Sequence, residues 1–89
     1  MSAARFLVQG RVQGVFYRAA TRSQALALGL RGCARNLADG RVDVRVAGPQ
    51  DALDALERWL WQGPELARVE AVTREPLAAE EVGQGFAIA

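Results

Sequence analysis

The nine residues GRVQGVFYR, positions 10 to 18, combine the residue types from which proteins build anion sites. They lie between an apolar run and a helical pattern, so unpaired backbone amides and the positive end of a helix dipole would face one point. Gly14 allows the backbone to curl around an oxyanion, and the guanidinium of Arg18 would add a planar fork of donors. The amides concerned belong to Gln13, Gly14, Val15, Phe16, Tyr17 and Arg18.

The spacing of this loop leaves two interpretations open. It matches neither the dinucleotide fingerprint nor the nucleotide P-loop, which needs a Gly-Lys pair followed by Ser or Thr. Short glycine-containing turns before helices are common, so a structural turn and an anion site are both possible. Taken singly, Arg18 fits an ordinary surface arginine, and Asn36 fits a turn residue before Asp39-Gly40.

Composition excludes several kinds of chemistry. The chain has 89 residues, which predicts one domain over residues 1–89. It contains no histidine and one cysteine, Cys33, so a Cys/His zinc site, a Ser-His-Asp triad and an internal disulfide are impossible. Cys33 fits a small strand residue. Glu80-Glu81 falls in a polar stretch, and no carboxylate cluster suggests magnesium, so we expect neither metal nor cofactor.

Charge is distributed unevenly along the chain. Residues 1–45 hold eight arginines and two aspartates, whereas residues 46–89 hold three arginines and eight acids, so the halves carry +6 and −5. This asymmetry would draw an anionic ligand toward the N-terminal half. No apolar run approaches the roughly 20 residues that span a bilayer, and the start lacks a secretion signal, so we expect a cytoplasmic protein.

Hydrophobic periodicity predicts strands and helices in the order βαββαβ. Thr21, Ala25 and Leu28 form a helical stripe that Gly29 ends, and Asp39-Gly40 indicates a hairpin. The predicted strands cover 4–9, 30–36, the run around Val42–Val46, 67–75 and a short edge strand at FAIA, and the second helix covers 50–62. This order is typical of an α+β ferredoxin-like sandwich, one antiparallel sheet with both helices on one face.

The predicted topology brings Asn36 to the loop. A strand, a helix and a second strand of one sheet form a crossover, so the first two strands run parallel and end at the same edge. Leu30, Ala34 and Asn36 share a face by parity. If Leu30 and Ala34 pack under the helices, Asn36 points to the helix side, beside the first helix's N-terminus.

Two segments, VQGRVQGVFYR and GCARNLADGRVDVRVAG, resemble those of acylphosphatases, small ferredoxin-like enzymes that hydrolyse the carboxyl-phosphate bond. The resemblance extends from the first strand to the end. It implies that Arg18 binds phosphate together with the loop amides from Gln13 onward, and that Asn36 orients the attacking water. Tyr17 stands where the family more often has phenylalanine, which would add a hydroxyl near the phosphate loop, and Cys33 stands where an aromatic residue is usual.

We therefore expect a metal-independent hydrolase that converts acyl phosphates to a carboxylate and inorganic phosphate, with phosphate also a competitor. A non-catalytic anion-binding module is the alternative, since the same loop would serve it. RNA binding is a weaker rival, because the strand RVDVRVA lacks the aromatics on which such domains stack bases. We expect a monomer with no nucleic-acid or membrane partner.

Overall fold

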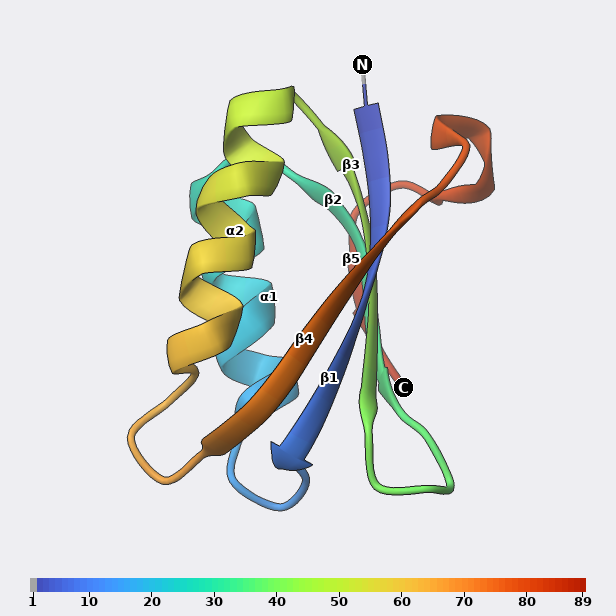
Figure 1. Cartoon of the computed structure of the whole chain (residues 1–89). Coiled ribbons are helices and arrows are strands. Elements are labelled where there is room, and N and C mark those ends of the chain that lie inside the picture. The colour runs from blue at the N-terminus through green and yellow to red at the C-terminus, as the bar shows by residue number, and fades with distance from the viewer. Residues whose placement is uncertain (1) are drawn as a thin grey trace.

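The fold is a two-layer sandwich in which two helices cover one face of a sheet. The computed structural model describes residues 2–89, so Met1 of the predicted domain lies outside them. The elements are β1 (Ser2–Arg11), α1 (Tyr17–Ala27), β2 (Arg31–Asn36), β3 (Val42–Gly48), α2 (Gln50–Gln62), β4 (Arg68–Pro76), a 3₁₀ turn η1 (Ala79–Glu81) and β5 (Phe86–Ile88). Both helices lie on the same side of the sheet (Figure 1). This arrangement confirms the predicted ferredoxin-like architecture.

The helices form where the apolar stripes predict them. In α2 the buried residues Leu53, Leu56 and Leu60 recur at helical spacing, and Pro49 and Gly63 flank the helix, so its predicted bounds are confirmed. In α1 the buried stripe is Tyr17, Thr21 and Ala25. This helix begins at Tyr17, two residues before the apolar pattern becomes visible, so Tyr17 and Arg18 belong to its first turn.

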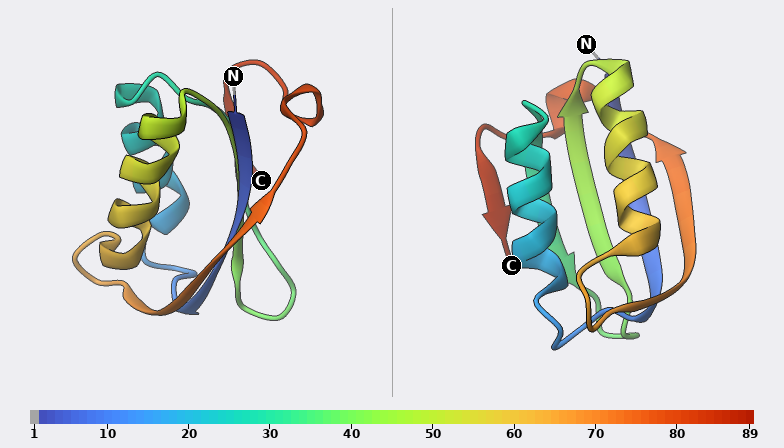
Figure 2. Two further views of the ribbon diagram at one scale, coloured as in Figure 1. Left: turned by 45° about the horizontal axis from the view of Figure 1, so that its top comes forward. Right: turned by 90° about the vertical axis from the view of Figure 1, so that its left-hand side faces the viewer.

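The sheet has the strand order β4-β1-β3-β2-β5 and is mixed rather than wholly antiparallel. β1 is antiparallel to both β3 and β4, and β2 is antiparallel to β3. The sequence predicts an antiparallel sheet throughout, but β5 pairs parallel with β2. The chain leaves β4 at one edge, passes through η1 and returns at the opposite edge in the direction of β2 (Figure 2).

The core lies between the helices and the sheet. Val42, Val44 and Val46 of β3 are fully buried there and pack with Phe6, Leu53 and other apolar residues of both layers. Trp59 packs against this core, whereas Trp61 is half exposed. Among residues 2–89, no helix is both long and apolar enough to cross a membrane.

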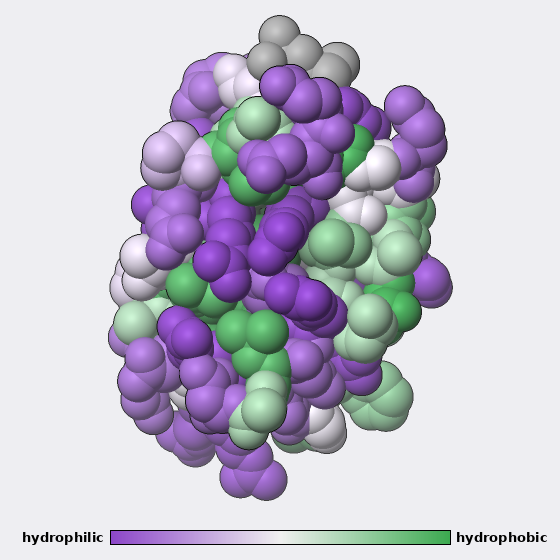
Figure 3. Space-filling view, turned by 90° about the vertical axis from the view of Figure 1, so that its right-hand side faces the viewer, coloured by the Kyte–Doolittle hydropathy of each residue, from purple (hydrophilic) through white to green (hydrophobic). Residues whose placement is uncertain are grey.

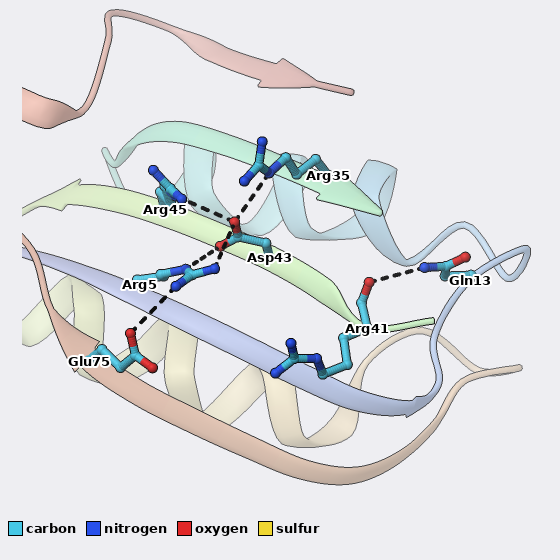
Figure 4. Close-up of polar contacts among 7 residues, drawn as sticks. All are labelled: Arg5, Gln13, Arg35, Arg41, Asp43, Arg45 and Glu75. Carbon is cyan, nitrogen blue, oxygen red and sulfur yellow. Dashed lines mark hydrogen bonds and ion pairs between the residues drawn. The ribbon is translucent and has the colours of Figure 1, made fainter. Parts of the chain in front are cut away.

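The sheet's other face is polar. Asp43 is only 1% exposed there, and its carboxylate accepts hydrogen bonds from Arg5 (3.0 Å) and Arg35 (3.2 Å) and pairs with Arg45 at 3.4 Å. Glu75 pairs with Arg5 at 3.6 Å. Hydrophilic side chains cross the middle of this face in Figure 3, and Figure 4 shows the arginines pointing at Asp43. Cys33 also belongs to this face, opposite Arg45 in the register.

Candidate active site

The backbone between β1 and α1 curls at alternate residues. Gly14 has φ of 75° and Phe16 has φ of 62°, both in the left-handed region. Within residues 2–89, the amides of residues 14–17 donate to no acceptor of the chain. Alternation of this kind turns successive N–H groups toward one concavity that suits an anion. At Gly14 the left-handed region is open without strain, because the residue has no Cβ.

Phe16 holds this conformation without being glycine. A left-handed backbone costs a non-glycine residue on the order of 1 kcal/mol, so neighbouring structure must maintain it. Phe16 caps α1, and its carbonyl accepts a hydrogen bond from the Ala20 amide at 3.0 Å. Phe16 is 80% exposed and adds little to the core, so its backbone conformation matters for the course of the loop and not for core packing.

A pocket of about 280 Å³ opens where the loop enters α1. It lies between the loop and the C-terminal strand β5, with the positive end of the α1 dipole beside it. Its lining residues are Val12, Gly14, Phe16, Tyr17, Arg18, Ala19 and Ile88. Arg18, the start of α1 and three of the four residues with free amides therefore line one cavity. Gln13, Val15 and Asn36 are not among its lining residues.

The backbone oxygen of Ala89 links Arg18 to the end of β2. It accepts a hydrogen bond from Nη1 of Arg18 and another from the amide of Asn36, the latter at 3.3 Å. Arg18 is separated from Ala89 by 71 positions in sequence. Two residues that the sequence places together by topology alone thus share an acceptor in the structure.

Asn36 is the last residue of β2 and lies on the helix side of the sheet. Ala34, two positions earlier on the same face, belongs to the buried core, and Val42 opposite Asn36 does too. Asn36 itself is exposed, and its carboxamide has no hydrogen-bond partner among the described residues. The amide group is therefore available to a ligand or a water molecule at this edge.

The Gln13 side chain joins the loop to the β2–β3 hairpin, a role that sequence analysis missed. Its Nε2 donates to the carbonyl oxygen of Leu37 at 2.9 Å. It also donates to that of Arg41 at 3.0 Å, the contact drawn in Figure 4. Leu37 directly follows Asn36, so this side chain fixes the distance between the loop amides and Asn36. The sequence carries little signal for such a contact, because a loop glutamine can bond in many directions.

The sequence predicts the Tyr17 hydroxyl near the loop between β1 and α1, but in the structure this hydroxyl points into the core. It donates a 2.6 Å hydrogen bond to the carbonyl of Leu60 near the end of α2, and burial raises the pKa of the Tyr17 hydroxyl. In a regular helix that carbonyl would accept from the residue four positions later, which is Pro64 and has no N–H. The hydroxyl supplies the missing donor.

Comparison with known proteins decides the family. The acylphosphatase family model matches residues 4–88. The chain belongs to the acylphosphatase family. An acylphosphatase from Xanthomonas oryzae pv. oryzae is 65% identical over 78 residues, which cover 88% of this chain and 89% of that protein. One from Nitrosococcus oceani is 46% identical and covers 92% of each chain. These matches confirm the family and the hydrolase class that the sequence predicts.

Solved structures of acylphosphatases share the fold. The acylphosphatase from Bacillus subtilis superposes with a TM-score of 0.94 at 30% identity, over all of this chain and 99% of that one. The one from Coxiella burnetii gives a TM-score of 0.91 at 35% identity, over 99% and 92%. The two-layer arrangement around the pocket is thus that of the family.

Proposed function

We propose that this chain hydrolyses acyl phosphates without a metal, with the phosphate held by the amides of residues 13–18 and Arg18 and the water oriented by Asn36. One observation supports this assignment: Arg18 and the backbone amide of Asn36 share an acceptor, the Ala89 oxygen, so the unpaired Asn36 carboxamide lies at the same edge of the sheet as the free loop amides. The family provides the reaction type, since the relatives from Xanthomonas oryzae pv. oryzae and Nitrosococcus oceani are named acylphosphatases.

The proposed reaction asks little of the protein. The water oxygen attacks phosphorus while the bond from phosphorus to the carboxyl oxygen breaks, and the carboxylate leaves with the bonding electron pair. Because a carboxylate is a stable leaving group, no general acid is needed. In a loose transition state the water keeps its proton until late, and that proton then passes to phosphate or solvent. A carboxamide that positions the water can therefore replace a basic side chain.

The loop and Arg18 supply the charge stabilisation. Negative charge on the equatorial phosphoryl oxygens is met by N–H donors that are already oriented before the substrate binds. Each charge-assisted hydrogen bond contributes about 1.5 to 3 kcal/mol, and correct positioning of the water contributes several kcal/mol more. Nη1 of Arg18 is held by the backbone oxygen of Ala89, and Arg18 lines the pocket, so we assign its remaining guanidinium donors to the phosphate.

Substitution of Asn36 by alanine tests the division of roles. We expect kcat for acetyl phosphate to fall at least 100-fold, because the water loses its positioning group, while the inhibition constant of inorganic phosphate changes less than about threefold. Arg18→Lys should instead weaken phosphate inhibition, because a point charge cannot reproduce the planar fork. Steady-state kinetics with phosphate as competitor measure both effects.

Arg22→Lys provides the matched control, since Arg22 is exposed on α1 and should leave both constants unchanged. An Asn36→Ala variant with wild-type kcat would refute the water-positioning role. Wild-type protein that binds phosphate but turns over no acyl phosphate would favour the anion-binding module instead. Activity that a chelator abolishes would contradict the metal-free mechanism.

A further inference from the structure

Two arginines face each other where β1 ends and β4 begins. Arg11 and Arg68 are directly opposed in the antiparallel ladder, in the register that follows the β-bulge at Gln9/Gly10. Gly10 permits this close pairing, because a Cβ there would lie 2.1 Å from the Arg68 carbonyl oxygen. Like charges directly opposite destabilise a strand pair. Within residues 2–89 neither guanidinium has an ion pair or hydrogen bond, so no direct partner offsets the repulsion in the free chain.

Both arginines line a second pocket, of about 460 Å³, beside the phosphate pocket. Gly14 lines both, and a Cβ built on it would meet no atom within 4 Å, so the two pockets adjoin at a residue that has no side chain. The remaining lining residues are Val15, Glu65, Leu66 and Ala67. Glu65 reduces the positive charge of this pocket, but two arginines against one carboxylate leave it net positive.

The geometry of phosphoryl transfer places the acyl group on this side. The attacking and leaving oxygens lie roughly in line across phosphorus. Asn36, the proposed water-positioning residue, ends β2, and the strand order puts β2 and β4 on opposite sides of β1. Figure 2 shows the two strands separated by β1 and β3. A leaving carboxylate that points away from Asn36 therefore points toward β4 and the two arginines.

We propose that Arg11 and Arg68 form a subsite for a second anionic group on the substrate. The favoured substrates are acyl phosphates whose acyl portion ends in a carboxylate or phosphate, so that one anion lies in the loop and the other between the arginines. The bound anion would offset the repulsion between the two guanidinium groups. This inference rests on the proposed function and adds to it a substrate class.

A pair of four-carbon substrates tests the subsite. Succinyl phosphate and butanoyl phosphate differ only in the remote carboxylate. We expect the wild type to have the higher kcat/KM for succinyl phosphate, and Arg11→Gln and Arg68→Gln each to lower that value about fivefold, since both sites are solvent-exposed. The value for butanoyl phosphate should stay within about twofold. Glu65→Gln should raise the preference for succinyl phosphate, and Arg22→Gln, on α1, should leave it unchanged.

The outcomes separate this inference from the proposed function. If the wild type hydrolyses neither substrate, the proposed function fails and the subsite with it. If it hydrolyses both and the arginine variants alter both equally or neither, the subsite is wrong while the proposed function stands. Thermal unfolding without ligand adds a second measurement: each variant should unfold at or above the wild-type temperature, because a like-charge contact is removed. A lower temperature would mark the arginines as structural and overturn the proposal.

Discussion

At the scale of single residues, the site depends on side chains that hold backbone in place. Gln13 is half buried, and its side-chain amide donates hydrogen bonds to two carbonyls of the β2–β3 hairpin, so it is not free for a substrate. The same carbonyls also accept from the hairpin itself, Leu37 from Gly40 and Arg41 from Leu37. We therefore expect Gln13 to matter less for the hairpin than for the position of the loop relative to Asn36.

Gln13→Met removes both donors while keeping the length of the side chain. We expect kcat for acetyl phosphate to fall about tenfold, because an error of about 1 Å between the loop and Asn36 can cost up to 100-fold. Stability should fall by only about 1 to 2 kcal/mol. Kinetics and urea unfolding measure the two effects, with Gln24→Met on the exposed face of α1 as control. A Gln13→Met enzyme with unchanged kcat would show that the loop keeps its place without this contact.

At the scale of elements, the open face of the sheet is held together by one buried carboxylate. Asp43 of β3 joins arginines from β1 and β2 across three strands. Burial by itself raises the pKa of Asp43, but the hydrogen bond from Arg5 and the charges of Arg5 and Arg45 outweigh it and hold that pKa below its ordinary value. The charged form is therefore the one that stabilises the sheet.

This pKa predicts an acid-sensitive contribution to stability. Because the folded-state pKa of Asp43 is lower than the unfolded one, near 3.9, the contribution is complete above about pH 4 and is lost as pH falls through the folded-state value. Asp43→Asn should lower the free energy of unfolding by about 2 kcal/mol at pH 7, and by less at pH 3.

Urea unfolding at the two pH values measures this difference. Glu80→Gln, an exposed carboxylate in η1, should change stability little at either pH. If Asp43→Asn unfolded at the same urea concentration as the wild type at pH 7, the interactions of Asp43 with the arginines would contribute no more to stability than hydration of the same groups does.

Sequence patterns predict these elements unevenly, for physical reasons. α2 is predicted with both bounds because its stripe is apolar and Pro49 and Gly63 flank it. The start of α1 is missed because its first turn is polar and aromatic. In addition, Phe16 adopts a left-handed backbone conformation that its residue type does not predict. The direction of β5 depends on the long connection from β4 through η1, and the residues of a three-residue strand do not predict it. Asn36 is placed correctly because strand parity and crossover topology together leave little choice.

At the scale of the whole molecule, the pocket is assembled from distant parts of the chain. Its walls come from the loop after β1 and from Ile88 of β5, a three-residue strand at the sheet's edge. Edge segments with few backbone bonds open with less free energy than central strands. The core strands β1 and β3 can therefore remain folded when β5 detaches from the sheet and the pocket loses one of its walls.

Activity should accordingly be lost before the fold. In increasing urea, we expect hydrolysis of acetyl phosphate to decline at a lower concentration than tryptophan fluorescence, which comes from Trp59, packed against the core, and from the half-exposed Trp61. Hydrogen exchange should show weaker protection at the Ala89 amide, which bonds Ala34, than at the amides of β3. Superimposable activity and fluorescence curves would mean that β5 unfolds only with the whole domain.

The bond from Tyr17 to Leu60 has a consequence for how related sequences diverge. The hydroxyl matters because α2 ends at Gln62, so the Leu60 carbonyl is among the last carbonyls of the helix, which have no donor within it. A descendant that replaces Tyr17 with phenylalanine inherits a buried carbonyl without a partner, unless the segment after α2 changes so that another donor reaches it. Position 17 and the residues that follow α2 should therefore covary across the lineages that share this fold.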